Sequence, residues 1–261
     1  MLLRIQSHLH YTTAQPCAVL LQIEAAQTTS QTIQSHDLHI PHVTDEAVIA
    51  GVDAIGTRRW LRSGSKFTCN YTAVVNVDRP AVALASLARD PLHTMNSEAT
   101  KYLMPSRYCH PEAFLDIVGN QFGTISGGAK IAAMADWIKT NFTYDIFASN
   151  AQTTAADSLA KKAGVCRDYA HVFIAMARAA AIPARFVSAY APDVSPQDFH
   201  ALTEVYLDGA WHLVDPTGMA DPAATICIGV GADAADVSFM TSYGWMDLVA
   251  QSVQVTRVDV K

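Results

Sequence analysis

The amino-acid sequence predicts an α+β fold in which an N-terminal antiparallel β domain precedes a core of helices packed on an antiparallel sheet. Apolar and polar residues alternate along 67–77, which is the period of a strand with one buried face. An apolar, alanine-rich run at 172–182 lacks proline and glycine and predicts a buried helix. Asp208 and Gly209 separate two short apolar runs, which is a strong signal for a β-hairpin.

The composition is that of a globular protein. The 261 residues carry a formal net charge of −6, and 50% of them are hydrophobic. This balance predicts a sizeable core rather than a disordered chain. Basic residues cluster only in two short pairs, so we expect no nucleic-acid partner. Apolar runs stay shorter than the ~18 residues that a membrane helix needs, so we also expect no membrane association.

The five cysteines are widely spaced, and none forms a Cys-x-x-Cys pair. This pattern favours reduced thiols over a disulfide framework or a zinc site. The segment 1–5 is followed at once by Gln6, Ser7 and His8, which is too polar for a signal peptide. We therefore expect a cytoplasmic protein, and no motif in the sequence calls for a cofactor.

Residues 1 to about 90 predict an antiparallel sandwich or sheet. Within it, the runs 58–61 and 66–77 flank Ser63-Gly64-Ser65, a pattern that predicts a hairpin. His36, His39 and His42 recur at intervals of three, so a metal-dependent hydrolase is one alternative. Because no cysteine or carboxylate pattern completes a ligand set, we favour exposed polar positions and no metal.

A polar connector at 87–110 leads into predicted helices at 111–118, 129–142 and 155–163. We place the domain boundary near residue 100, with the β domain at 1–100 and the core at 101–261. Cys109 and His110 are adjacent in this connector. Neighbouring side chains usually diverge, so we regard this pair as a poor catalytic dyad.

The second region is organised around Cys166, which follows a glycine-led turn at Gly164 and begins a predicted helix at 166–181. Free amides and the dipole at a helix start favour a negative charge, so a thiol placed there becomes a better nucleophile. A buried structural cysteine is the alternative that this stretch alone leaves open.

The predicted hairpin brings a histidine and an aspartate together. If Asp208-Gly209 is a two-residue turn, Leu207 faces Ala210, and His200 and Asp215 become diagonal neighbours on one face of the sheet. A three-residue turn would place them on opposite faces. We therefore predict a triad in which Cys166 attacks a carbonyl, His200 acts as base and acid, and Asp215 orients the imidazole. The local rivals Asp168 and His171 point away from Cys166 along the helix, so we expect structural roles for them.

The sequence resembles the bacterial transglutaminase-like superfamily, which includes proteins regarded as cysteine proteases with a papain-like core. The resemblance is carried by the segments 164–171 (GVCRDYAH) and 181–187 (AIPARFV), by His200-Ala201, Glu204-Val205 and Trp211, and by Asp215-Pro216-Thr217. It implies a papain-like core and the same assignment of Cys166, His200 and Asp215. Leu202 departs from the family's common His-Ala-Trp, and Gly231-Ala232-Asp233 stands where relatives often have Gly-Arg-Asp.

Two oxyanion donors are predicted. The amide of Cys166 is free at the helix start. Tyr144 lies in the segment 142–145, which matches a family segment at the end of the preceding helix; a packed aromatic ring with a solvated hydroxyl is the alternative. The predicted activity is thiol-dependent cleavage of a peptide, isopeptide or related amide bond in a peptide or protein substrate. Acyl transfer to an amine and a catalytically idle binding module are the alternatives, and the sequence leaves the oligomeric state open.

Overall fold

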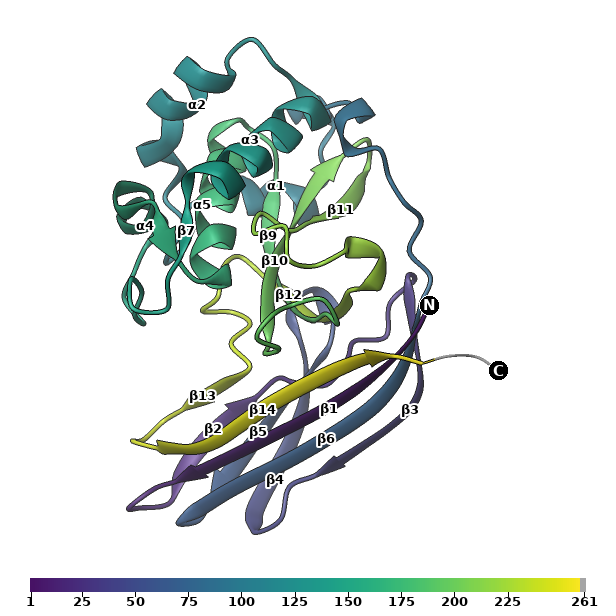
Figure 1. The fold of residues 1–261 in the computed structure, drawn as a ribbon, viewed down its shortest axis with the longest axis vertical. Coiled ribbons are helices and arrows are strands. Elements are labelled where there is room, and N and C mark those ends of the chain that lie inside the picture. Colours follow the sequence, from purple (N-terminus) through teal and green to yellow (C-terminus); the bar gives the residue numbers. More distant parts are fainter. Residues whose placement is uncertain (259–261) are drawn as a thin grey trace.

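The computed structural model describes residues 1–258 and comprises a β-sandwich and a helical core built on a separate sheet (Figure 1). All strand pairs of the sandwich are antiparallel. One of its sheets has the order β14-β1-β6-β3, formed by Asp247–Arg257, Leu2–Thr12, Lys66–Val77 and Gln31–His39. The other has the order β13-β2-β5-β4, formed by Met240–Ser242, Cys17–Leu21, Thr57–Ser63 and Val43–Ala50.

Strand β6 has the alternation that the sequence predicts. Its inward residues are buried, and they meet buried residues of β1, β2 and β14 in one apolar cluster. The buried inward residues of β6 are Phe67, Cys69, Tyr71, Ala73, Val75 and Val77.

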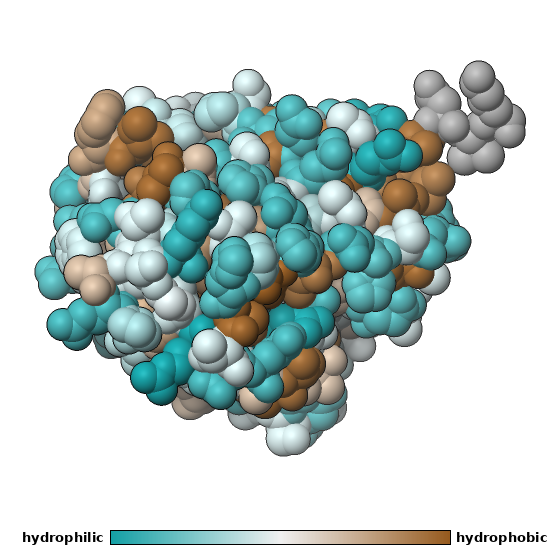
Figure 2. All heavy atoms as spheres, turned by 90° about the horizontal axis from the view of Figure 1, so that it is seen from below, coloured by the Kyte–Doolittle hydropathy of each residue, from teal (hydrophilic) through white to brown (hydrophobic). Residues whose placement is uncertain are grey.

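Figure 2 views the molecule from below, and the hydrophobic residues on this face form separate patches among hydrophilic ones.

The predicted hairpin between 58–61 and 66–77 is wrong. Strand β5 pairs with β2 and β4, whereas β6 pairs with β1 and β3, so the chain crosses from one sheet to the other at Gly64. The connection from β1 to β2 crosses alongside it, and Thr13 N donates to Ser65 O at 3.0 Å. A short polar turn between two strands is compatible with a hairpin or with such a crossing, and the sequence pattern does not distinguish them.

The sandwich also takes in the end of the described chain. β13 pairs with β2, and β14 pairs with β1 along almost its whole length, from Leu3–Arg257 to Thr12–Asp247. The sequence-based division into 1–100 and 101–261 does not include this return. Periodicity indicates that a segment is a strand, but it does not say which distant strand will be its neighbour.

The core sheet has the order β11-β10-β9-β12 and is antiparallel. A two-stranded parallel pair, β7 and β8, lies beside the start of helix α5. The core strands are Ala210–Val214 (β11), His200–Leu207 (β10), Ala184–Tyr190 (β9) and Ile226–Gly231 (β12), with Thr143–Tyr144 (β7) and Ala163–Gly164 (β8). The helices are Ser97–Thr100 (α1), Leu115–Phe122 (α2), Gly127–Asn141 (α3), Ala155–Lys161 (α4) and Cys166–Ala179 (α5), and a 3₁₀ turn at Pro111–Phe114 precedes α2.

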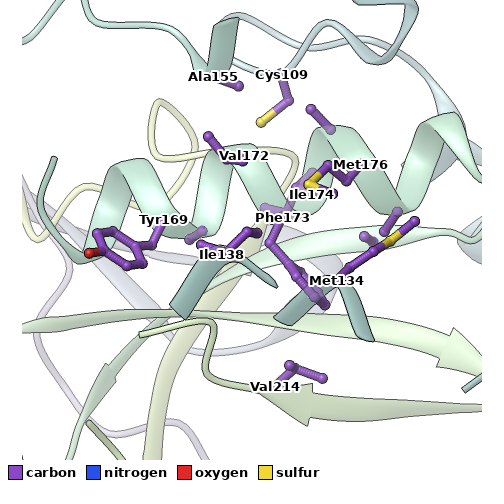
Figure 3. Packing of buried hydrophobic residues seen from close by; sticks show 14 of the residues in the cluster. Cys109, Met134, Ile138, Ala155, Tyr169, Val172, Phe173, Ile174, Met176 and Val214 are labelled. Carbon is purple, nitrogen blue, oxygen red and sulfur yellow. The ribbon is translucent and has the colours of Figure 1, made fainter. Parts of the chain in front are cut away.

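Helix α5 is the centre of the core, as its nearly apolar sequence predicts. Every residue from Asp168 to Arg178 is buried. Figure 3 shows Met134, Ile138 and Val214 on one side of the helix and Cys109 and Ala155 on the other. Each fully buried large apolar side chain contributes roughly 1.5–3 kcal/mol, so this packing fixes the position of the helix start.

The sandwich and the core sheet share an apolar cluster. Tyr190 of β9, together with Ile226 and Ile228 of β12, packs among the buried residues of the sandwich. The Tyr190 hydroxyl donates to Ile23 O at 2.8 Å, and its ring lies 6.4 Å from the ring of Tyr71. The two parts are therefore joined by a buried contact, which sets the sandwich against the first residues of β10.

Candidate active site

Cys166 lies at the first position of α5, where the sequence predicts it. Asp168 lies in the first turn of α5, and its buried Oδ2 accepts a hydrogen bond from Val165 N at 2.8 Å. The carboxylate therefore caps the start of the helix. A Cβ atom at Gly164 would lie 2.6 Å from Asp168 Cβ, so only glycine leaves room for this cap. The turn that delivers Cys166 therefore depends on Gly164 and Asp168, in keeping with a structural role for the aspartate.

Tyr144 is brought beside Cys166 by the parallel pair of β7 and β8, in which Tyr144 stands opposite Gly164. Asp145 N donates to Gly164 O at 3.0 Å and extends this pairing. Tyr144 is 39% exposed, and its ring lies 6.1 Å from the ring of Tyr169. Partial burial and the nearby Cys166 raise the pKa of Tyr144 well above its usual range, so its hydroxyl stays protonated and able to donate.

His200 and Asp215 meet as the hairpin register predicts. The pairs Thr203–Val214 and Leu207–Ala210 show a two-residue turn at Asp208-Gly209. His200 Nε2 lies 3.0 Å from Asp215 Oδ2. Their side chains are only 1% and 2% exposed, so this contact is shielded from water.

The Asp215 carboxylate is held by more than the histidine. Oδ1 accepts hydrogen bonds from the amide and the hydroxyl of Thr217, at 2.8 and 2.7 Å. Oδ2 also accepts from the amides of Met219 and Ala220, at 3.1 and 2.7 Å. The turn after β11 thus wraps the carboxylate in donors and favours its ionised form. Sequence analysis did not assign these donors a role, although Asp-Pro-Thr is a recognisable signal for an Asx turn.

The electrostatics of the pair favour an imidazolium beside a carboxylate. Burial alone would lower the pKa of His200, but the hydrogen bonds and charges of Asp215 and Cys166 outweigh it and raise the pKa to about 9. Burial alone would raise the pKa of Asp215, whereas the His200 contact and the Ala220 amide lower it below its usual value. With Nε2 bonded to Asp215, the other ring nitrogen, Nδ1, is left for Cys166.

The segment that leads into His200 is fastened to the sandwich. The side-chain amide of Gln197 bonds both backbone groups of Val255 on β14, accepting from N at 2.7 Å and donating to O at 3.0 Å. Asp198 accepts a hydrogen bond from Gln251 Nε2 at 2.8 Å. The ring of Phe199 stacks on that of Phe239, with ring centroids 4.6 Å apart and planes 4° apart. Sequence reasoning missed these contacts, because nothing in the local pattern links 197–199 to residues 40 to 58 positions away.

The other four cysteines sit in different surroundings from Cys166. Cys17, Cys69, Cys109 and Cys227 are buried, whereas Cys166 is partly exposed, and all five are free thiols. Burial raises the pKa of Cys69, Cys109 and Cys227 to about 12, which keeps these thiols protonated and unreactive at neutral pH.

The remaining sequence candidates lie apart from this site. His171 is fully buried, and burial lowers its pKa to about 3; its Nε2 accepts from Ala234 N at 3.2 Å and its ring stacks on Tyr108. His36 and His39 lie on β3, and His42 follows it in the crossing to β4. Within residues 1–258, no group of three histidine, cysteine or carboxylate side chains is placed to hold a metal ion.

Two further features of residues 1–258 bear on ligands and membranes. A cavity of about 650 Å³ opens between the sandwich and the back of the core sheet, lined in part by Arg79, Glu204 and Trp211, and Cys166 is not among its lining residues. Over this same part of the chain, the structure contains no helix with the length and apolar character needed to cross a bilayer.

Comparisons with known proteins assign the family. A family model described as the transglutaminase-like superfamily matches residues 118–216. A crystal structure of a candidate cysteine protease from Cytophaga hutchinsonii is 30% identical, with a TM-score of 0.92 and coverage of 100% of this chain and 92% of that one. The chain belongs to the transglutaminase-like superfamily, which is a family of thiol-dependent enzymes. The predicted family and fold class are thereby confirmed.

More distant relatives were also found. An uncharacterised protein of Mycobacterium leprae is 27% identical over 187 residues, and the match spans 67% of this chain and 66% of that protein. The periplasmic domain of TgpA from Pseudomonas aeruginosa is 17% identical, with a TM-score of 0.46 and coverage of 80% of this chain and 72% of that one.

Proposed function

We propose that this protein is a thiol-dependent hydrolase that cleaves peptide, isopeptide or related amide bonds through a Cys166–His200–Asp215 triad. The observation that carries the proposal is the buried His200–Asp215 contact, at 3.0 Å, on an imidazole whose pKa is raised to about 9 by Asp215 and Cys166 against the effect of burial. The partial exposure of Cys166, in contrast to the four buried cysteines, supports the same assignment.

In the proposed reaction, Cys166 Sγ attacks the carbonyl carbon and forms a C–S bond while the carbonyl oxygen takes up negative charge. The backbone amide of Cys166 and the hydroxyl of Tyr144 donate to that oxygen. His200 Nδ1 gives its proton to the leaving nitrogen as the C–N bond breaks, which leaves a thioester. His200 then takes a proton from water, the resulting hydroxide attacks the thioester, and Cys166 departs as a thiolate. Asp215 holds the imidazole in orientation and balances its charge.

The substrate class that we propose is a peptide or protein amide, without a cofactor or nucleic acid. Acyl transfer shares the thioester, so an amine that competes with water would turn the same site into a cross-linking enzyme. An idle binding module is the other alternative, and it is less favoured because no member of the triad is missing. We further propose a cytoplasmic location, since five free thiols suit a reducing compartment.

The first test is the rate at which iodoacetamide labels each of the five cysteines between pH 5 and 9, read by mass spectrometry. At pH 6 we expect Cys166 to react at least about 100-fold faster than Cys109 or Cys227, and to lose that advantage in His200→Ala. His212→Ala is the matched control, because this half-buried histidine of β11 lies outside the proposed triad and hydrogen-bonds Leu207 O. Equal rates at all five cysteines would contradict the proposal and favour the binding module.

A second assay separates hydrolysis from transfer. The wild-type protein is incubated with a peptide and isopeptide library in the presence and absence of a fluorescent primary amine. Release of free carboxyl products supports the hydrolase, whereas incorporation of the amine at the expense of hydrolysis supports the acyltransferase. The Cys166→Ala variant should do neither.

A further inference from the structure

The segment 145–150, which we name the 145–150 loop, is tied to the chain on both sides of Cys166. Asp145 N bonds Gly164 O at 3.0 Å, two residues before the cysteine. Arg167, the next residue after it, donates through Nη2 to Ser149 Oγ and to Asn150 O, both at 2.6 Å. The loop therefore spans the position of the cysteine and is fixed to the same turn that positions it.

The loop is also braced by a hydrogen bond of its own and by side chains from α4 and α5. Asp145 Oδ1 accepts from Phe147 N at 2.8 Å, and Lys161 Nζ donates to Ala148 O at 3.0 Å. The Arg167 guanidinium that holds its far end lies 5.9 Å from the centre of the Tyr108 ring. Such a set of contacts holds a loop in one conformation, as a specificity element requires.

Two large apolar side chains are nevertheless left in solvent on this braced loop. Ile146 is 64% exposed and Phe147 is 90% exposed. Adjacent exposed apolar residues on an ordered segment mark a surface that another molecule covers. Their continuity with Tyr144, which contacts Cys166, joins this surface to the candidate active site.

The proposed chemistry decides which part of a substrate meets the loop. His200 must lie against the leaving nitrogen in order to protonate it. Tyr144, the proposed donor to the carbonyl oxygen, directly precedes the loop, so we assign the acyl side of the attacked carbonyl to the loop. Building on the proposed function, we propose that Ile146 and Phe147 form an acyl-side specificity wall, and that the preferred substrate carries a large apolar side chain next to the attacked carbonyl.

The test uses tripeptide chloromethyl ketones, Ala-Ala-X, with X as Phe, Leu, Gln or Asp. These reagents contain only the acyl side of a substrate, and Cys166 Sγ displaces chloride from them to form a C–S bond. We expect Phe and Leu reagents to inactivate the wild-type protein at least about tenfold faster than the Asp reagent. Phe147→Ala should reduce that preference several-fold, and Ile146→Ala should do so to a smaller extent.

Two controls keep the outcomes distinct. Iodoacetamide has no side chain to recognise, so its rate at Cys166 should be the same in Phe147→Ala as in the wild type. Leu115→Ala, which removes a 55% exposed side chain on α2, should leave the preference unchanged. If the wild type lacks fast iodoacetamide labelling, the proposed function fails and the wall fails with it.

Fast iodoacetamide labelling with equal rates for Phe and Asp reagents would overturn the wall alone. So would a preference that Phe147→Ala leaves intact. Sedimentation of the wild type and of Phe147→Ala addresses a second copy as the occupant. A dimer that the substitution dissociates, with unchanged reagent preference, would assign the loop to self-association and overturn the proposal.

Discussion

The two halves of the candidate site are built in different ways. The half around Cys166 is held by neighbours in sequence, with the Asp168 cap and the β7–β8 pair all inside residues 143–168. The half around His200 is held by distant ones, since Gln197, Asp198 and Phe199 are fastened to residues between 239 and 255. The comparison teaches that local hydrogen bonds shape the turn that presents the proposed nucleophile, whereas the lead into the proposed base depends on the sandwich.

The two halves also differ in their contact with water. Cys166 is partly exposed, which suits the proposed nucleophile because it must meet a substrate. The His200–Asp215 contact is almost completely shielded, and four donors besides the histidine surround the carboxylate. The proposed nucleophile is therefore open to a substrate, whereas the His200–Asp215 pair is shielded from water, where the interaction between its charges is stronger.

Asp215→Asn gives the largest expected effect, because it removes the negative charge that holds His200 in its protonated form. We expect amide cleavage to fall by roughly 100-fold or more, since the neutral amide no longer stabilises the imidazolium. The pKa of His200 should fall from about 9 toward its ordinary value of 6.5. This narrows the pH range of amide cleavage from the alkaline side, because cleavage needs a protonated His200 to donate to the leaving nitrogen. Rates measured from pH 5 to 10 check this.

Asp193→Asn is the matched control for that variant, since Asp193 pairs with Arg257 on the surface. It should leave both the rate and the profile unchanged. An Asp215→Asn variant with a wild-type pH profile would mean that the carboxylate does not act through His200.

The second prediction concerns the free energy of unfolding. The pKa of His200 is raised in the folded protein, so its protonated form stabilises the fold fully below about pH 6.5, and this contribution is lost as the pH rises through about 9. The difference corresponds to roughly 3 kcal/mol as an upper bound. Urea unfolding at pH 6 and pH 9.5 should therefore show a larger loss for the wild type than for His200→Ala, and parallel losses would contradict the prediction.

Asp215 acts in the opposite direction. Its pKa is lowered in the folded protein, so the stability it contributes is present above its ordinary value of 3.8 and is lost as the pH falls through the lower folded value. The two groups together give a stability maximum between the acid range of the aspartate and the alkaline range of the histidine.

The third prediction tests the comparison itself, with one variant in each half. Asp168→Ala leaves the Val165 amide without its buried acceptor, and we expect a loss of about 1–3 kcal/mol. Cys166 alkylation should slow at every pH, because the helix start is disturbed while His200 is not. Asp168→Asn keeps a side-chain oxygen and should recover most of the rate.

Gln197→Ala is its counterpart in the other half, and its expected effect is the smaller, at about 1–2 kcal/mol. Here cleavage should fall several-fold and the pH profile of alkylation should shift, because the lead into His200 is loosened. Arg257→Ala, which breaks a surface pair on the same strand, should change neither. If Asp168→Ala and Gln197→Ala gave the same pH profile of Cys166 alkylation, the proposed difference between the two halves would be contradicted.

The difference between the halves also explains what could be predicted from the sequence. The helix start, the two-residue turn and the register that joins His200 to Asp215 follow from short-range rules, and the structure agrees with them. The family and the fold class are confirmed, and the catalytic roles stay predictions. The pairing of β14 with β1, the crossing at Gly64 and the hold of Gln197 on Val255 depend on contacts between distant segments, about which periodicity and turn chemistry carry no information.

The pairing of β14 with β1 has a consequence for the order in which the protein matures. A ribosome makes the strand at 247–257 long after the segment around Cys166, at 5–20 residues per second, so several seconds separate them. During that interval the nascent chain already carries its cysteine, but the strand that fastens the lead into His200 has not yet been made. The thiol is thus present in the nascent chain for several seconds before the lead into His200 can be fastened to the sandwich.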